Sequence, residues 1–158
     1  MNIFFLHQNP HQAAKYQYNK HIVKMVLESA QMLCTAHHCI LGDEADVPYK
    51  AAHKNHPSTV WARRSANNYE WLYHHFVALS AEYKRRYGKE HLSFTKLAEF
   101  LKNPPKNLTK GPMTPFAQAM PDDVKDSDPV VAYKNYYTKY KREIATWNRG
   151  RQQPTWWK

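Results

Sequence analysis

The sequence predicts an all-α fold: a single compact domain with three main helices, a short helix and a long proline-rich loop. Two observations favour this class. The chain has only 4 glycines, and its apolar residues recur at spacings of three and four instead of alternating, as is typical of helices. At 158 residues it can bury one sizeable core and is too short for two comfortable domains. Residues 1–158 are therefore expected to fold together.

The first long helix has clear start and stop signals. Residues 2–6 are expected to form a short strand or an extended lead-in, and Asn9 or Pro10 can begin the helix, because proline suits a first helical turn. The helix is predicted over about residues 11–40. It would end at Gly42, since glycine tolerates the backbone conformation of a helix C-cap.

The second long helix follows a polar loop over residues 43–57. It is predicted to begin at Ser58 or Thr59 and to end at Gly88, after a basic last turn that suits the helix dipole.

The last third of the chain is less regular. Ser93 is a fair N-cap for a short helix over about residues 94–102. The six prolines of residues 103–129 predict a long irregular loop, and such loops are usually functional or mobile. Asp128 and Pro129 then open a final helix, predicted over about residues 130–147.

The charge balance indicates a polyanionic partner. Lys and Arg outnumber Asp and Glu by 23 to 13, which gives a formal net charge of +10. Neutralisation of phosphates is the usual physical use of such an excess, so we expect a polyanion, with nucleic acid favoured, as the partner. The protein itself is expected to be a monomer.

The sequence shows no targeting or membrane signal. The apolar run at the N-terminus lacks the basic flank and the length of a signal peptide, and no stretch approaches a membrane span. The protein is expected to be cytosolic, or nuclear if its host has a nucleus, without contact with membranes. Cys34 and Cys39 suggest neither a zinc site nor a disulfide, and are expected to be buried free thiols.

One face of the first predicted helix is polar, although the rest of that helix is apolar. At about 100° per residue, six polar positions fall within an arc of roughly 100°: His21, Lys24, Glu28, Gln31, Thr35 and His38. A carboxylate next to apolar side chains needs a partner or a shifted pKa, which suggests a site that works as a general acid or base or stabilises a positive charge. The alternative is a polar face that a neighbouring helix half covers.

Two further clusters could contact DNA. The first gathers donors at a junction between a loop and a helix, where a phosphate would bind well: His53, Lys54, Asn55 and His56, with Arg63 and Arg64 beyond them. Its alternative is a capped helix start beside a solvated loop. The second interleaves aromatic and basic side chains, which suits base stacking and backbone neutralisation: Lys134, Trp156, Trp157 and Lys158.

The sequence contains no motif typical of a metal site or of other common catalytic sites. Ten histidines are many, yet no metal-binding spacing such as HExxH or CxxC occurs, and no Gly-rich phosphate loop or nucleophile elbow is present. We therefore expect no metal and no cofactor.

Three segments resemble the pyrimidine-dimer DNA glycosylase family of the phage endonuclease V type. They are the tripeptide Asn19–Lys20–His21 with Glu28 seven residues after the histidine, the run Tyr83–Gly88 and the ending Gln153–Lys158. The resemblance implies an endonuclease V-like all-α fold and a metal-independent glycosylase with AP lyase activity, whose partner is damaged or modified double-stranded DNA. Such an enzyme moves a base out of the duplex stack.

The same resemblance implies the site residues. An N-terminal amine would attack the sugar C1′ and form an imine, Glu28 would stabilise the cationic sugar, and His21 would orient or contact a phosphate. In the family the amine belongs to a threonine exposed by removal of the initiator. Here the second residue is Asn2, whose size usually leaves Met1 in place, so Met1 and Asn2 are both candidates for the catalytic amine.

Three functions are therefore considered. The leading hypothesis is a DNA glycosylase and AP lyase that acts on damaged or modified pyrimidines. A second keeps the scaffold but has Glu28 activate an added nucleophile, so that the protein modifies a flipped base in viral DNA. The third is a non-catalytic nucleic-acid-binding module.

Overall fold

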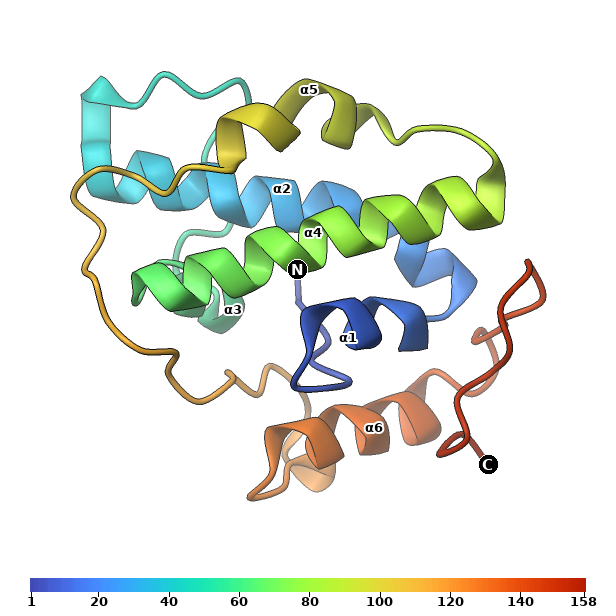
Figure 1. Cartoon of the computed structure of the whole chain (residues 1–158). Coiled ribbons are helices and arrows are strands. Elements are labelled where there is room, and N and C mark those ends of the chain that lie inside the picture. The colour runs from blue at the N-terminus through green and yellow to red at the C-terminus, as the bar shows by residue number, and fades with distance from the viewer.

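The computed structural model describes residues 1–158 and is all-helical, which confirms the predicted fold class. Its elements are α1 (Pro10–Tyr16), α2 (Asn19–Leu41), η1 (Gly42–Glu44), α3 (Pro57–Ala62), α4 (Ala66–Tyr87), α5 (Leu92–Leu101), η2 (Asp122–Val124) and α6 (Pro129–Tyr140). The long helices α2 and α4 pack against each other at the centre, α5 contacts both, and α1 packs along α4 (Figure 1). In the same view α6 lies beyond α1, and the chain from α5 to α6 runs along the outside (Figure 1).

Both predicted long helices are interrupted. Gln17 and Tyr18 are extended between α1 and α2, because their polar groups have other partners: the Gln17 carbonyl accepts a hydrogen bond from Arg86 Nη1 at 2.7 Å. The second interruption separates α3 from α4. Here Ser65 caps α4 by accepting a hydrogen bond from the backbone N–H of Asn68.

Three smaller predictions also differ from the structure. The short helix α5 begins one residue earlier than its predicted cap, because His91 and not Ser93 accepts the capping hydrogen bond. The final helix ends at Tyr140 instead of near residue 147. Of the two cysteines, Cys34 is buried as expected, whereas Cys39 is exposed.

The N-terminal segment is the extended lead-in and forms no strand. Residues 2–6 are all buried, and the Phe5 ring stacks on Phe116 with a centroid separation of 4.0 Å. Phe116 belongs to the proline-rich loop, so this loop closes over the N-terminal segment. A chain terminus is usually mobile, but this one is part of the core.

A buried ion cluster joins α4 to the C-terminal tail. The guanidinium of Arg86 donates from Nε to Glu82 Oε2 at 3.0 Å, and Arg151 of the tail binds the same carboxylate. The Arg86 side chain is fully buried. Because a buried charge is costly without its partners, this cluster fixes the tail against α4.

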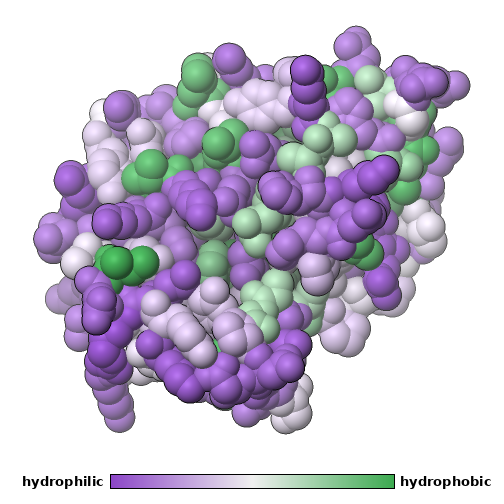
Figure 2. Space-filling view, turned by 180° about the vertical axis from the view of Figure 1, so that it is seen from behind, coloured by the Kyte–Doolittle hydropathy of each residue, from purple (hydrophilic) through white to green (hydrophobic).

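The surface is mostly polar. Figure 2 shows hydrophilic residues over most of one face, with small hydrophobic patches scattered between them. None of the helices combines the length and the apolar character that a membrane span needs.

Candidate active site

The N-terminal segment brings the start of the chain onto α2, next to Glu28. The α-amino nitrogen of Met1 lies 3.8 Å from Glu28 Oε2, and the backbone N–H of Asn2 donates to the same oxygen at 3.2 Å. The other carboxylate oxygen faces Lys24, whose Nζ is 3.5 Å away. Glu28 is 8% exposed, so a mostly buried carboxylate has two cationic neighbours and one amide donor. These four residues were predicted site residues, and the structure brings them together.

The side chain of Asn2 holds this arrangement in place. Its Nδ2 donates to the carbonyl of Ala119 at 2.7 Å, and its Oδ1 accepts from the Tyr133 hydroxyl at 3.0 Å and from Ser58 Oγ at 3.4 Å. These partners come from the proline-rich loop, α6 and α3. We call Asn2, Ser58, Ala119 and Tyr133 the Asn2 clamp. Since each of its hydrogen bonds is buried or half-buried, the clamp fixes the residue that follows the amine.

His21 lies in the core beside this site. Its Nε2 is 2.7 Å from the hydroxyl oxygen of Tyr18, and its Nδ1 is 2.7 Å from that of Tyr137. Burial, followed by the nearby charges of Lys141 and Lys24, lowers the pKa of His21 well below its ordinary value, so the ring is neutral near pH 7. The phosphate contact expected for His21 does not fit this geometry, because both ring nitrogens are occupied and the side chain is buried.

His56 approaches the site from the start of α3. Its Nδ1 accepts a hydrogen bond from the backbone N–H of Ser58 and so caps that helix. Burial lowers the pKa of His56, and the N-terminal amine lowers it further, while Glu28 acts in the opposite direction. Since Nδ1 is an acceptor, the neutral ring carries its proton on Nε2, which leaves a hydrogen-bond donor.

The comparison with known families identifies the class of protein. A family model described as pyrimidine dimer DNA glycosylase matches residues 1–95, which is more than half of the chain. The chain belongs to the pyrimidine dimer DNA glycosylase family. Neither a curated protein nor a solved structure matches it. The matched range contains Met1, Asn2, His21, Lys24 and Glu28, and the family implies a DNA substrate.

Lys141 is a cation of this family member's site that the sequence did not single out. Burial lowers the pKa of Lys141, and the nearby charge of Lys24 lowers it further. Its Nζ lies 5.0 Å from the centre of the Tyr136 ring. Lys141 follows the end of α6, so its approach to Lys24 is a tertiary contact, which no local pattern reveals. The two lysines therefore bring positive charges near each other, and Lys24 also pairs with Glu28.

The remaining polar positions of α2 have structural partners. Thr35 Oγ1 donates to the Gln31 carbonyl at 2.7 Å, and His38 Nε2 is 2.8 Å from the carbonyl of Tyr49. Gln31 and His38 are half-buried, and Thr35 is buried. The polar face therefore divides into a site at its N-terminal end and a half-covered structural part at its C-terminal end.

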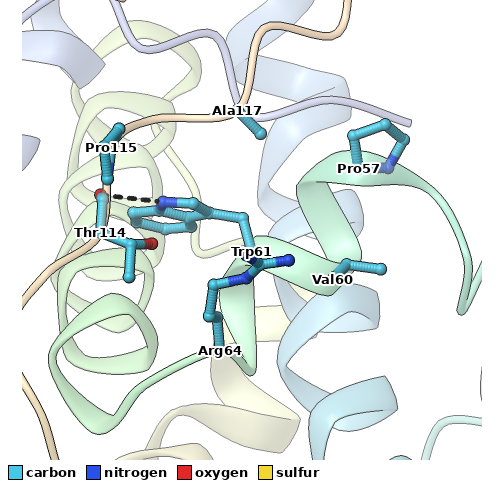
Figure 3. Close-up of a pocket in the computed structure, with 7 residues that line it drawn as sticks. All are labelled: Pro57, Val60, Trp61, Arg64, Thr114, Pro115 and Ala117. Atoms are coloured by element: carbon cyan, nitrogen blue, oxygen red, sulfur yellow. Dashed lines mark hydrogen bonds between the residues drawn. The ribbon is translucent and has the colours of Figure 1, made fainter.

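The donor cluster around α3 is only partly assembled. His53, Lys54 and Asn55 are exposed in the loop before this helix. The Arg63 side chain folds back, with Nη1 donating to the carbonyl of Thr59 at 3.2 Å. Arg64 lines a cavity of about 440 Å³ between α3 and the proline-rich loop. There the Trp61 ring lies between Arg64 and the 114–117 segment, and its Nε1 donates to the Thr114 carbonyl (Figure 3).

The C-terminal cluster forms cation–π pairs on the surface. Lys134 lies over the Trp156 ring, with Nζ 5.5 Å from its centre, and Arg142 lies 5.4 Å from the centre of Trp157. Both tryptophans are half-buried, whereas Lys158 is exposed. The structure thus brings Lys134 and Trp156 together as predicted, although this cluster lies outside the range matched by the family model.

Proposed function

We propose that this protein removes damaged pyrimidines from double-stranded DNA through an imine with its N-terminal amine, and then cleaves the strand as an AP lyase. The observation that carries the proposal is the separation of 3.8 Å between the Met1 nitrogen and Glu28 Oε2. A primary amine next to a mostly buried carboxylate combines a nucleophile with a group that accepts its proton and stabilises a cation.

The proposed reaction begins with the neutral amine of Met1. Its lone pair attacks C1′ of the damaged nucleotide, the bond from C1′ to the base breaks, and the base leaves with that electron pair and takes a proton from water. The ammonium formed at C1′ loses a proton to Glu28. Glu28 passes this proton to O4′ as the bond from C1′ to O4′ breaks, which opens the sugar ring and gives a protonated imine. Loss of a C2′ proton then expels the 3′ phosphate by β-elimination. Hydrolysis of the imine regenerates the amine.

The surrounding groups bind and orient the substrate in this proposal. Lys24 and Lys141 contact the phosphates next to the damaged nucleotide. His56 donates from Nε2 to the same region. His21 stays in the core and does not contact the substrate, since its ring nitrogens are hydrogen-bonded to Tyr18 and Tyr137.

Trapping with borohydride tests the proposal. Reduction during the reaction should join the protein covalently to a duplex oligonucleotide that contains a cyclobutane pyrimidine dimer or an abasic site. Mass spectrometry of the digested adduct should place the DNA on the N-terminal peptide, at the Met1 nitrogen. An unmodified duplex is the control and should give no adduct. If the substrate strand is cleaved without any trapped adduct, or if the adduct lies on an internal lysine, the proposed mechanism is wrong.

A further inference from the structure

The N-terminal segment contains a residue whose backbone conformation does not suit its side chain. Phe4 has φ +61°, in the left-handed region that bulky L-residues rarely adopt. The other non-glycine residue with positive φ is His53, which lies in an exposed loop. Phe4, by contrast, is 4% exposed and lies three residues from the amine. Strain of this kind persists only where the surroundings impose it, and it is concentrated at functional sites.

The ring of Phe4 is held from several sides. Its centroid lies 4.1 Å from that of His21 on α2, 5.6 Å from Tyr137 and 5.9 Å from Tyr136 on α6. His21 is itself fixed by the hydroxyl groups of Tyr18 and Tyr137. The ring therefore packs between α2 and α6, on the side to which the turn at Phe4 directs it.

The turn at Phe4 decides where the chain start lies. On its C-terminal side, the N–H of Leu6 donates to the Phe4 carbonyl at 2.9 Å and closes a tight turn. On its N-terminal side, Met1 and Asn2 lie next to Glu28. Three residues span up to about 10 Å, so a change of φ at Phe4 to the extended region would move the amine by several ångströms. A displacement of about 1 Å in a reacting group can reduce a rate about 100-fold.

We propose that Phe4 is a positioning residue for the imine-forming step: its left-handed backbone, which the buried residues on both sides of it hold in place, directs the N-terminal amine at Glu28. The inference rests on the proposed function, because it concerns the geometry of the same amine. The turn at Phe4 sets the direction of residues 1–3, and the Asn2 clamp then holds Asn2 at that place.

A pair of variants with the same atoms tests the inference. Phe4→Ala and Phe4→D-Ala leave the same cavity, but only the D-residue favours positive φ. The chains are made by joining synthetic residues 1–33 to residues 34–158 at Cys34, and the wild-type chain is assembled in the same way. We expect Phe4→Ala to form the trapped adduct about 100-fold more slowly than the wild type, and Phe4→D-Ala at least tenfold faster than Phe4→Ala. The DNA dissociation constants should agree, because a role in binding would change them.

Thermal stability provides a second measurement, which does not depend on the imine. Glycine tolerates positive φ and alanine does not, so Phe4→Gly should have a Tm about 2–4 °C above that of Phe4→Ala. Phe5 is the matched control, since it is fully buried in the same segment and has no positive φ. At position 5, Phe5→Ala should be more stable than Phe5→Gly. If Ala is also the more stable residue at position 4, the inference is wrong.

The remaining outcomes are equally decisive. Phe4→Leu keeps most of the buried volume, so it replaces the smaller variants if these do not fold. It should form the trapped adduct about tenfold more slowly than the wild type, with unchanged DNA affinity. Equal trapping by the D- and L-alanine chains, or a wild-type rate for Phe4→Leu, overturns this inference alone. Absence of any adduct with the wild type overturns the proposed function and this inference together.

Discussion

Replacement of Glu28 by glutamine should abolish most of the catalysis and leave DNA binding intact. The Glu28→Gln side chain still accepts the Asn2 N–H hydrogen bond but loses its charge. That charge lies 3.8 Å from the Met1 nitrogen, where the proposed reaction forms a cationic imine. At an effective dielectric constant of about 20, two unit charges at this separation interact by about 4 kcal/mol. If this stabilisation is specific to the cationic transition state, its loss slows the chemical step about 10³-fold.

Single-turnover kinetics with excess protein measure this effect directly. Cleavage of the glycosidic bond in a dimer-containing duplex, followed as strand scission after alkali treatment, gives the rate of the chemical step, and fluorescence anisotropy gives the dissociation constant. The constant should stay the same or fall slightly, since a negative charge near phosphates is removed. Glu70→Gln is the control, because Glu70 is an exposed carboxylate that pairs with His74 on α4, and it should keep the wild-type rate. A rate for Glu28→Gln within tenfold of the wild type would refute the reasoning.

Three other outcomes are expected. Burial lowers the pKa of His75 from 6.5 to about 4, so the folded state binds fewer protons than the unfolded state. The free energy of unfolding should therefore fall by about 3 kcal/mol through this group as the pH drops from 6.5 to 4. Urea unfolding at several pH values measures this change. Arg86→Met leaves the buried Glu82 with fewer partners and should reduce the free energy of unfolding by about 3–5 kcal/mol, whereas the same change at the exposed Lys84 should have little effect. Lys141→Ala should lower the slope of log K against log salt by about 1 in DNA titrations, if Lys141 contacts one phosphate.

The fold class could be predicted because helical periodicity is a local signal, but the breaks in the helices depend on distant residues. The extended Gln17 between α1 and α2 is explained by Arg86, which is 69 residues away in the sequence. The break before α4 had a local signal, since Ser65 is a good N-cap, but the apolar spacing continues across it. A prediction from periodicity alone therefore joined α1 to α2 and α3 to α4. In the structure a tertiary contact separates the first pair, and a helix cap separates the second.

The candidate site was predicted in part for the same reason. Lys24 and Glu28 are four residues apart on one helix, so their pairing is local. The approach of the amine to Glu28 was suggested by the resemblance to the family. The Asn2 clamp and Lys141 were missed, because their contacts join the chain start or α2 to segments more than 50 residues away. The resemblance to the family suggested a phosphate contact for His21, although the two tyrosines that occupy its nitrogens make it part of the core.

A nucleophile at a chain end, as proposed for Met1, presents a physical problem, because termini are ordinarily mobile and catalysis needs the reacting atoms in place before the reaction. This chain meets the problem by burying the residues that follow the amine. The burial puts a polar side chain, Asn2, inside the protein, where an unpaired amide would be costly, and three separate segments supply its partners. Two of these, the proline-rich loop and α6, lie beyond residue 95, outside the range that the family model matches. The matched range thus holds the amine and the carboxylate, while the unmatched part of the chain keeps them together.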